Sequence, residues 1–160
     1  MNISKSSVHI IGSLDLSQGG PSYTVPRLAE ELAQLSWNTK IATMEAPSNL
    51  TKRGVPISIY PQSFSNIPLL NKLGISPSMV SGIMKFRPGI VHIHGLWRMQ
   101  LAYAFKAAAN IQAPIIVSTR GMLGTEAMAF SKLSKKLFNY GIQKRILSSV
   151  DCFHATAESE

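Results

Sequence analysis

Short apolar runs alternate with helical patterns along the whole chain. The apolar runs end abruptly at polar or glycine residues, and they predict strands at Val8–Ile11, Thr39–Thr43, Ile57–Tyr60, Ile90–His94, Ile115–Ser118 and Cys152–Ala155. Between them, apolar residues recur at helical spacing around residues 25–35, 79–84, 99–109 and 131–148. Regular alternation of strand and helix predicts an α/β fold with a parallel sheet and helices on both faces.

Proline and glycine positions suggest where the elements begin. Pro26 has no N–H, so we expect it in the first turn of the first helix. Ser76 and Pro77 read as an N-cap followed by a first helical residue. The proline-containing stretch 63–74 predicts irregular structure.

Length and composition indicate one domain with a sizeable core. The chain has 160 residues, of which 45% are hydrophobic. No apolar run is long enough to cross a bilayer, and residues 1–7 lack the apolar region of a signal peptide. The single cysteine, Cys152, fits a reducing cytoplasm, and its apolar strand predicts a small core residue. We therefore expect a cytoplasmic protein.

Positive charge is concentrated near the C-terminal end. The formal net charge is +8, and residues 127–150 contain five lysines and arginines but no acidic residue. The amphipathic helix expected at 131–148 suits either a peripheral contact with an anionic membrane or a solvated face over an apolar stripe. Aromatic residues do not interleave with this basic run, which argues against nucleic acid as a partner.

Three side chains follow the ends of neighbouring predicted strands. His94, Trp97 and Arg120 lie where a parallel sheet binds its ligands, outside the carboxyl ends of the strands. Trp97 suits either stacking on a sugar or capping the core. Arg120 suits either pairing with a phosphate or carboxylate, or a salt bridge to Glu126 or Glu30.

A glycine-rich loop joins the first strand to the first helix. Gly19, Gly20 and Pro21 lead into that helix, whose N-terminus suits a phosphate, although an ordinary Gly-Pro turn has the same pattern. The loop lacks the Gly-x-Gly-x-x-Gly fingerprint, which disfavours NAD or FAD, and the chain has no phosphate-loop motif.

Two histidines share one face of the fourth predicted strand. His92 and His94 are two residues apart, but a metal site needs a third ligand and no carboxylate is obvious nearby, so we expect no metal. His92 is expected to be a packed or hydrogen-bonded core residue, whereas His94, beside Gly95, is the better candidate for ligand contact.

Four segments together resemble family 4 of the retaining glycosyltransferases. They are Gly19-Gly20-Pro21 with residues 25–33, then Ile90–Trp97, Val117–Leu123 and Phe153–Glu160. The resemblance spans nearly the whole chain and is strongest to the bacterial enzymes that build polysaccharides. Many relatives have a histidine where this chain has Arg120, and Glu-Pro-Trp where it has Gly124-Thr125-Glu126.

The resemblance implies half of a GT-B fold, in which two Rossmann-like domains face each other across a cleft. Residues 1–160 would be the acceptor-side domain, a three-layer sandwich with a mostly parallel sheet, without the donor-binding domain. It implies transfer of a hexose from a nucleotide sugar to a glycan or lipid-linked acceptor, without a cofactor or metal. The substrate-binding residues it implies are Gly19, Gly20, Pro21, His94, Trp97, Arg120 and Gly121.

Other functions remain open at this point. A free-standing, flavodoxin-like binding or regulatory domain fits the same pattern, as does a basic module that binds a membrane or nucleic acid. Residues 156–160 directly follow the last predicted strand, which suggests a chain cut at a domain boundary or a frayed tail. If the chain is a half-enzyme, we expect it to have little transferase activity alone.

Overall fold

Six parallel strands form one sheet with helices on both faces, as predicted. In a computed structural model of residues 1–160, the described residues are 4–47, 54–122 and 143–157. The strands are β1 (Ser6–Ser13), β2 (Asn38–Glu45), β3 (Ile57–Ile59), β4 (Ile90–His94), β5 (Ile115–Ser118) and β6 (Cys152–His154). Their order in the sheet is β3-β2-β1-β4-β5-β6, and every neighbouring pair is parallel.

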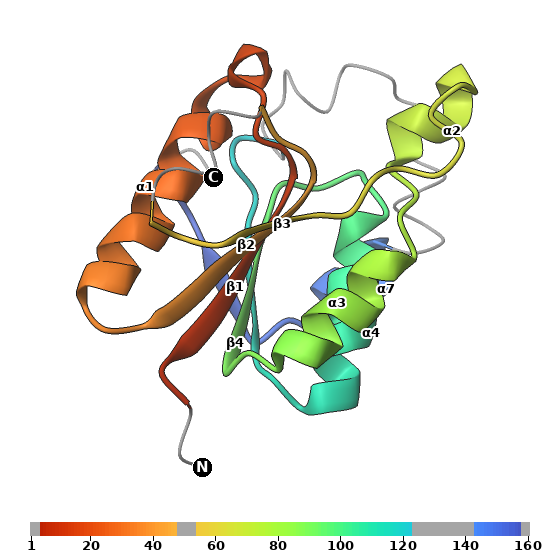
Figure 1. Ribbon diagram of the computed structural model, residues 1–160. Coiled ribbons are helices and arrows are strands. Elements are labelled where there is room, and N and C mark those ends of the chain that lie inside the picture. Colours follow the sequence, from red (N-terminus) through yellow and green to blue (C-terminus); the bar gives the residue numbers. More distant parts are fainter. Residues whose placement is uncertain (1–3, 48–53, 123–142, 158–160) are drawn as a thin grey trace.

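The helices divide between the two faces (Figure 1). Helix α1 (Gly20–Gln34) covers one face, where Ile11, Ile41 and Val25 form a small core cluster. Helices α3 (Ser78–Phe86), α4 (Gln100–Ile111) and α7 (Lys144–Leu147) lie on the other face. The larger core there includes Ile10 and Ile93, which are fully buried. The short η1 (Leu16–Gln18) and α2 (Pro68–Leu73) complete the described helices.

Several expected boundaries were wrong. Helix α1 begins at Gly20, so Pro26 lies inside it beyond the first turn, and Pro21 occupies its second position. Pro77 precedes α3 as its cap residue, while the Ser76 hydroxyl donates to the Tyr60 carbonyl at 3.0 Å instead of capping the helix. The stretch 63–74 contains α2, which ends at Gly74 in a left-handed conformation.

The last strand is less buried than its apolar sequence suggested. Cys152 is exposed, and Phe153 on the same strand is 52% exposed. The prediction of Cys152 as a core residue was therefore wrong, because β6 is the edge strand of the sheet. Of the basic helix expected at 131–148, only residues 143–148 are described, and they include α7.

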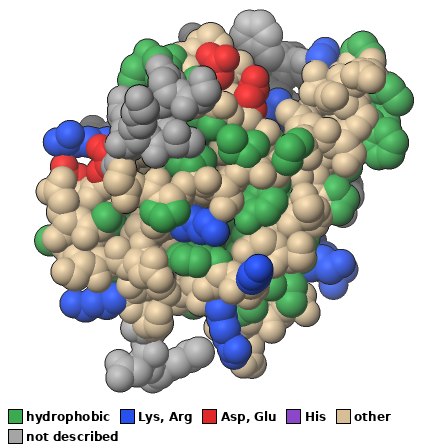
Figure 2. Space-filling model, in the orientation of Figure 1, with side chains coloured by type: hydrophobic (Ala, Val, Ile, Leu, Met, Phe, Trp, Pro, Cys, Tyr) green, Lys and Arg blue, Asp and Glu red, His purple; other side chains and the backbone are tan. Residues whose placement is uncertain are grey.

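The exterior of the described part has two further features. Lys and Arg side chains are spread singly over the face in Figure 2 and do not gather in one patch there. No helix among the described residues is long and apolar enough to span a membrane.

Candidate functional site

The carboxyl ends of β1, β4 and β5 meet beside the start of α1. This edge brings together His94 from β4, Arg120 after β5, and Gly20 and Thr24 from the first turns of α1. Arg120 donates from Nη1 to the Thr24 hydroxyl at 3.2 Å and from Nη2 to His94 Nδ1 at 3.2 Å. Its guanidinium therefore joins α1 to β4 across the edge of the sheet.

A chain of hydrogen bonds continues from Arg120 into the sheet. His94 Nε2 lies 3.1 Å from His9 Nδ1, His9 Nε2 lies 3.3 Å from Ser7 Oγ, and Ser7 bonds to Thr39 at 3.1 Å. Arginine can only donate, so His94 Nδ1 accepts and a neutral His94 carries its proton on Nε2. His94 then donates to His9 Nδ1, and His9 donates from Nε2 to Ser7. We call this series, from Arg120 to Thr39, the histidine relay.

Burial keeps these imidazoles neutral. Desolvation, followed by the positive charge of Arg120, lowers the pKa of His9 to about 4. Desolvation, with smaller effects from His9, His154 and Arg120, lowers the pKa of His92 to about 3. The pKa of His94 is also well below its usual value, chiefly through desolvation and then through His92. At neutral pH Arg120 is therefore the cation of this group.

A separate pair of hydrogen bonds, beside the relay, reaches the edge strand, and the His92 ring contacts the rings of His9 and His94. His92 Nε2 lies 2.8 Å from the Ser118 hydroxyl, which lies 2.8 Å from His154 Nδ1. His92 is 7% exposed, so the prediction of a hydrogen-bonded core histidine is confirmed.

The sequence analysis found two possible metal ligands, and the fold supplies a third. Ring nitrogens of His9, His92 and His94 all lie within 4.8 Å of one another. Neutral imidazoles suit zinc or another late transition metal. However, both ring nitrogens of His94 already take part in the relay, and the Arg120 cation lies against one of them. The hydrogen bonds of this group fit the relay better than a metal centre.

A pocket of about 270 Å³ opens between α1 and Arg120. It is lined by Gly20, Pro21, Thr24, Arg120 and Thr156, none of which is acidic. Cβ atoms added at Gly19 or Gly20 would meet nothing within 4 Å, so the backbone here is open to approach. A helix N-terminus and a guanidinium at one pocket form a positive site suited to a phosphate.

The other predicted residues lie close to this edge but differ in role. Gly19 and Gly121 have φ values of 90° and 73°, which favour glycine. Trp97 packs on the larger core and donates its indole N–H to the Met122 carbonyl at 3.4 Å, as expected of a residue that caps the core, while its contact with a sugar stays a prediction. Glu126, one suggested partner of Arg120, lies outside the described residues.

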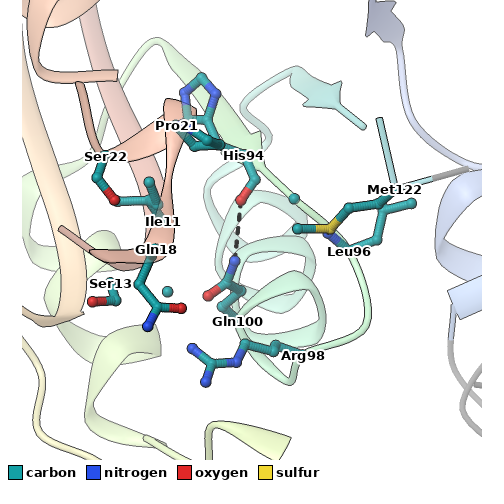
Figure 3. A pocket seen from close by; sticks show the side chains of 12 residues that line it. Ile11, Ser13, Gln18, Pro21, Ser22, His94, Leu96, Arg98, Gln100 and Met122 are labelled. Atoms are coloured by element: carbon teal, nitrogen blue, oxygen red, sulfur yellow. Dashed lines mark hydrogen bonds between the residues drawn. The ribbon is translucent and has the colours of Figure 1, made fainter. Parts of the chain in front are cut away.

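Pro21 also lines a second pocket, of about 200 Å³ (Figure 3). Arg98 and Gln100, which follow β4, line it together with Ser22 of α1 and Gly12 of β1. The sequence analysis missed Ser22, Arg98 and Gln100, and it also missed His9 of the relay. The signal in the sequence was the position of His9 on a strand, of Arg98 and Gln100 in the segment after β4, and of Ser22 directly after the Gly-Gly-Pro turn.

Comparisons with known proteins agree with this architecture. The sequence model of the glycosyl transferase 4-like domain matches residues 19–160. The fold is similar to that of Anabaena Alr3699/HepE, whose crystal structure was solved in complex with UDP and glucose, with a TM-score of 0.55 and 13% sequence identity. The similarity covers 82% of this chain but 34% of HepE, so the chain spans about a third of that protein. No curated protein sequence matches significantly.

Proposed function

Because the chain belongs to the glycosyl transferase 4-like domain family, we propose that it is the acceptor-side part of a glycosyltransferase. In this proposal the enzyme transfers a hexose from a nucleotide sugar to a glycan or lipid-linked acceptor in bacterial polysaccharide biosynthesis. It acts in the cytoplasm, and the basic segment 131–148 gives it a peripheral contact with the membrane. The family match does not favour a free-standing regulatory domain.

One observation carries the proposal: Arg120 is held beside the N-terminus of α1 by two hydrogen bonds. Transfer from a nucleotide sugar leaves negative charge on the departing diphosphate. Fixed positive groups stabilise such charge without rearranging during the reaction. Arg120 and the first turn of α1 supply this charge at the 270 Å³ pocket, so the proposal needs no metal or other cofactor.

The relay has a defined task in this proposal. His94 accepts from Arg120 only while it is neutral, and burial keeps it neutral. The proton on His94 Nε2 is directed at His9 Nδ1, so the hydrogen bond to His9 supports the tautomer in which Nδ1 accepts from Arg120. The relay therefore positions the guanidinium, while Arg120 itself contacts the diphosphate.

Titration of the 160-residue chain with UDP, followed by NMR of the backbone amides, tests the proposal. We expect the largest shifts at Gly20, Thr24 and Gly121. Arg120→Gln should weaken UDP binding at least tenfold, and Arg120→Lys should restore part of it, since a charge remains but the planar fork is lost. We also expect little turnover of UDP-glucose by this chain alone.

Arg145→Gln on α7 is the matched control. It removes the same charge from an exposed position on the opposite face of the sheet and should leave UDP binding unchanged. The proposal would be contradicted if the Arg120→Gln variant bound UDP as tightly as the wild type while its amide spectrum was that of a folded protein.

A further inference from the structure

The 200 Å³ pocket contains buried polar groups that the fold itself leaves unsatisfied. Gln100 is 2% exposed, and its Nε2 donates to the His94 carbonyl at 3.2 Å. That bond fixes the orientation of the amide, because only the nitrogen can donate. Gln100 Oε1 has no hydrogen-bond partner. Buried polar atoms are nearly always paired, so this oxygen needs a donor from a ligand or water.

A second unsatisfied group comes from a different element. Ser22, in the first turn of α1, is 1% exposed, and its hydroxyl also has no partner. Both Ser22 and Gln100 line the same pocket, one from each side (Figure 3). Two buried groups that lack partners at one cavity are typical of a site that binds a hydroxylated molecule.

Arg98 gives this pocket a positive charge. It is half-buried, and within the described part of the chain it makes no ion pair or side-chain hydrogen bond. No acidic residue lines the pocket. Figure 3 shows the guanidinium below the Gln100 amide, on the side of the pocket near Gln18 and Ser13.

Gly12 keeps the space between these groups open. A Cβ there would lie 2.7 Å from Arg98 Nη1 and 2.8 Å from Gln100 Oε1. A cation and a carbonyl oxygen that both lack partners therefore converge on one point of β1. An anion alone would be repelled by Oε1, and a neutral sugar would leave Arg98 uncompensated. A sugar ring that carries hydroxyls as well as an anionic group satisfies Gln100 Oε1 and Arg98 together.

We propose that this pocket binds an acidic sugar, a single ring that bears a carboxylate or a phosphate, as the terminal residue of the acceptor. The inference rests on the proposed transferase function and names its substrate class. The anionic group pairs with Arg98, one ring hydroxyl donates to Gln100 Oε1, and another bonds to Ser22. A volume of about 200 Å³ is below the range for drug-sized ligands and suits one sugar residue.

Titration of the chain with D-glucuronate, D-glucose 6-phosphate and D-glucose, followed by amide NMR, tests the inference. We expect both acidic sugars to bind at least tenfold more tightly than glucose and to shift Gly12, Ser22 and Gln100. The two acidic probes distinguish a carboxylate from a phosphate as the preferred group. Arg98→Gln should reduce their affinity to that of glucose.

Two further variants separate recognition from misfolding. Ser22→Ala should weaken binding of all three sugars severalfold while the chain stays folded, whereas Arg145→Gln should change none of them. Equal affinity for glucose and the acidic sugars, or unchanged affinity in Arg98→Gln, would overturn the inference. UDP binding depends on Arg120 at the other pocket, so the chain would still bind UDP if the acidic-sugar inference failed. Failure of the chain to bind UDP would instead count against the transferase proposal.

Discussion

The neutral histidines predict a steep loss of stability in mild acid. In the unfolded chain each histidine has a pKa near 6.5, whereas in the fold the pKa is about 4 for His9, about 3 for His92 and well below 6.5 for His94. The unfolded state therefore binds more protons than the native state between about pH 4 and 6.5. Stability is full above pH 6.5 and falls as the pH drops below it.

The size of this effect follows from linkage. At pH 5.5 each unfolded histidine is about nine-tenths protonated, so unfolding takes up roughly 2.7 protons when all three native imidazoles stay neutral. From pH 6.5 to 5.0 the loss is between about 1 and 2 kcal/mol per histidine, or about 5 kcal/mol for three imidazoles that stay neutral in the fold. Domains are typically stable by only about 5–15 kcal/mol, so we expect acid unfolding to begin near pH 5.

Urea unfolding followed by circular dichroism at pH 7.5, 6.5, 5.75 and 5.0 measures the proton uptake from the slope of stability against pH. Aspartate and glutamate titrate mainly below this range, so the slope reports the histidines. His9→Asn keeps an acceptor near the position of Nδ1 but removes one titrating group, and it should reduce the uptake by about 0.9 proton. A wild-type uptake below one proton would show that these imidazoles are not held neutral by the fold.

Two further predictions concern stability at neutral pH. Ser22→Ala should leave the free energy of unfolding unchanged or raise it by up to about 1 kcal/mol in urea titrations, because it removes a buried hydroxyl without a partner and adds a better helix former. The control is Ser81→Ala, which removes an exposed hydroxyl that donates to the Ser78 carbonyl. If the free energy of unfolding fell by more than about 1 kcal/mol in Ser22→Ala but not in Ser81→Ala, the Ser22 hydroxyl would have a partner. Leu101→Ala in α4 should lower the free energy of unfolding by about 3 kcal/mol, because this fully buried side chain leaves a cavity in the larger core. Leu35→Ala, at a 68% exposed position, should change it by less than about 0.5 kcal/mol, and similar losses in both variants would contradict this account of the core.

The sheet could be predicted because parallel strands that are buried on both faces appear as continuous apolar runs. All six strands were expected, and Ile90–His94 and Ile115–Ser118 have the predicted bounds. Helix ends were less predictable. The Gly-Pro start of α1 pointed to a loop as readily as to a helix, and residues 68–73 had too few positions for a helical period to emerge.

The site was only partly predictable because it depends on strand order. His9 meets His92 through the register of β1 with β4, although the two residues are 83 positions apart. The sequence shows which residues end a strand but not which strands are neighbours, so His9 could not be joined to the pair on β4. The Gln100 amide was missed for a related reason, since its burial depends on how α4 packs beside β1.

Backbone geometry links the relay to the site. Trp97 and Arg120, which follow adjacent strands, have φ values of 64° and 54°, a conformation that side chains other than glycine rarely adopt. Gly95, two residues before Trp97, and Gly121, directly after Arg120, also have positive φ, so the chain turns back sharply at both strand ends. At Arg120 this turn directs the guanidinium across the sheet edge to His94 and Thr24. A residue held in this way costs about 1–3 kcal/mol, and such strain clusters at functional sites. Glycine at position 120 would relieve the strain but would remove the guanidinium that links the relay to the pocket at α1, which is the physical reason for an arginine in this turn.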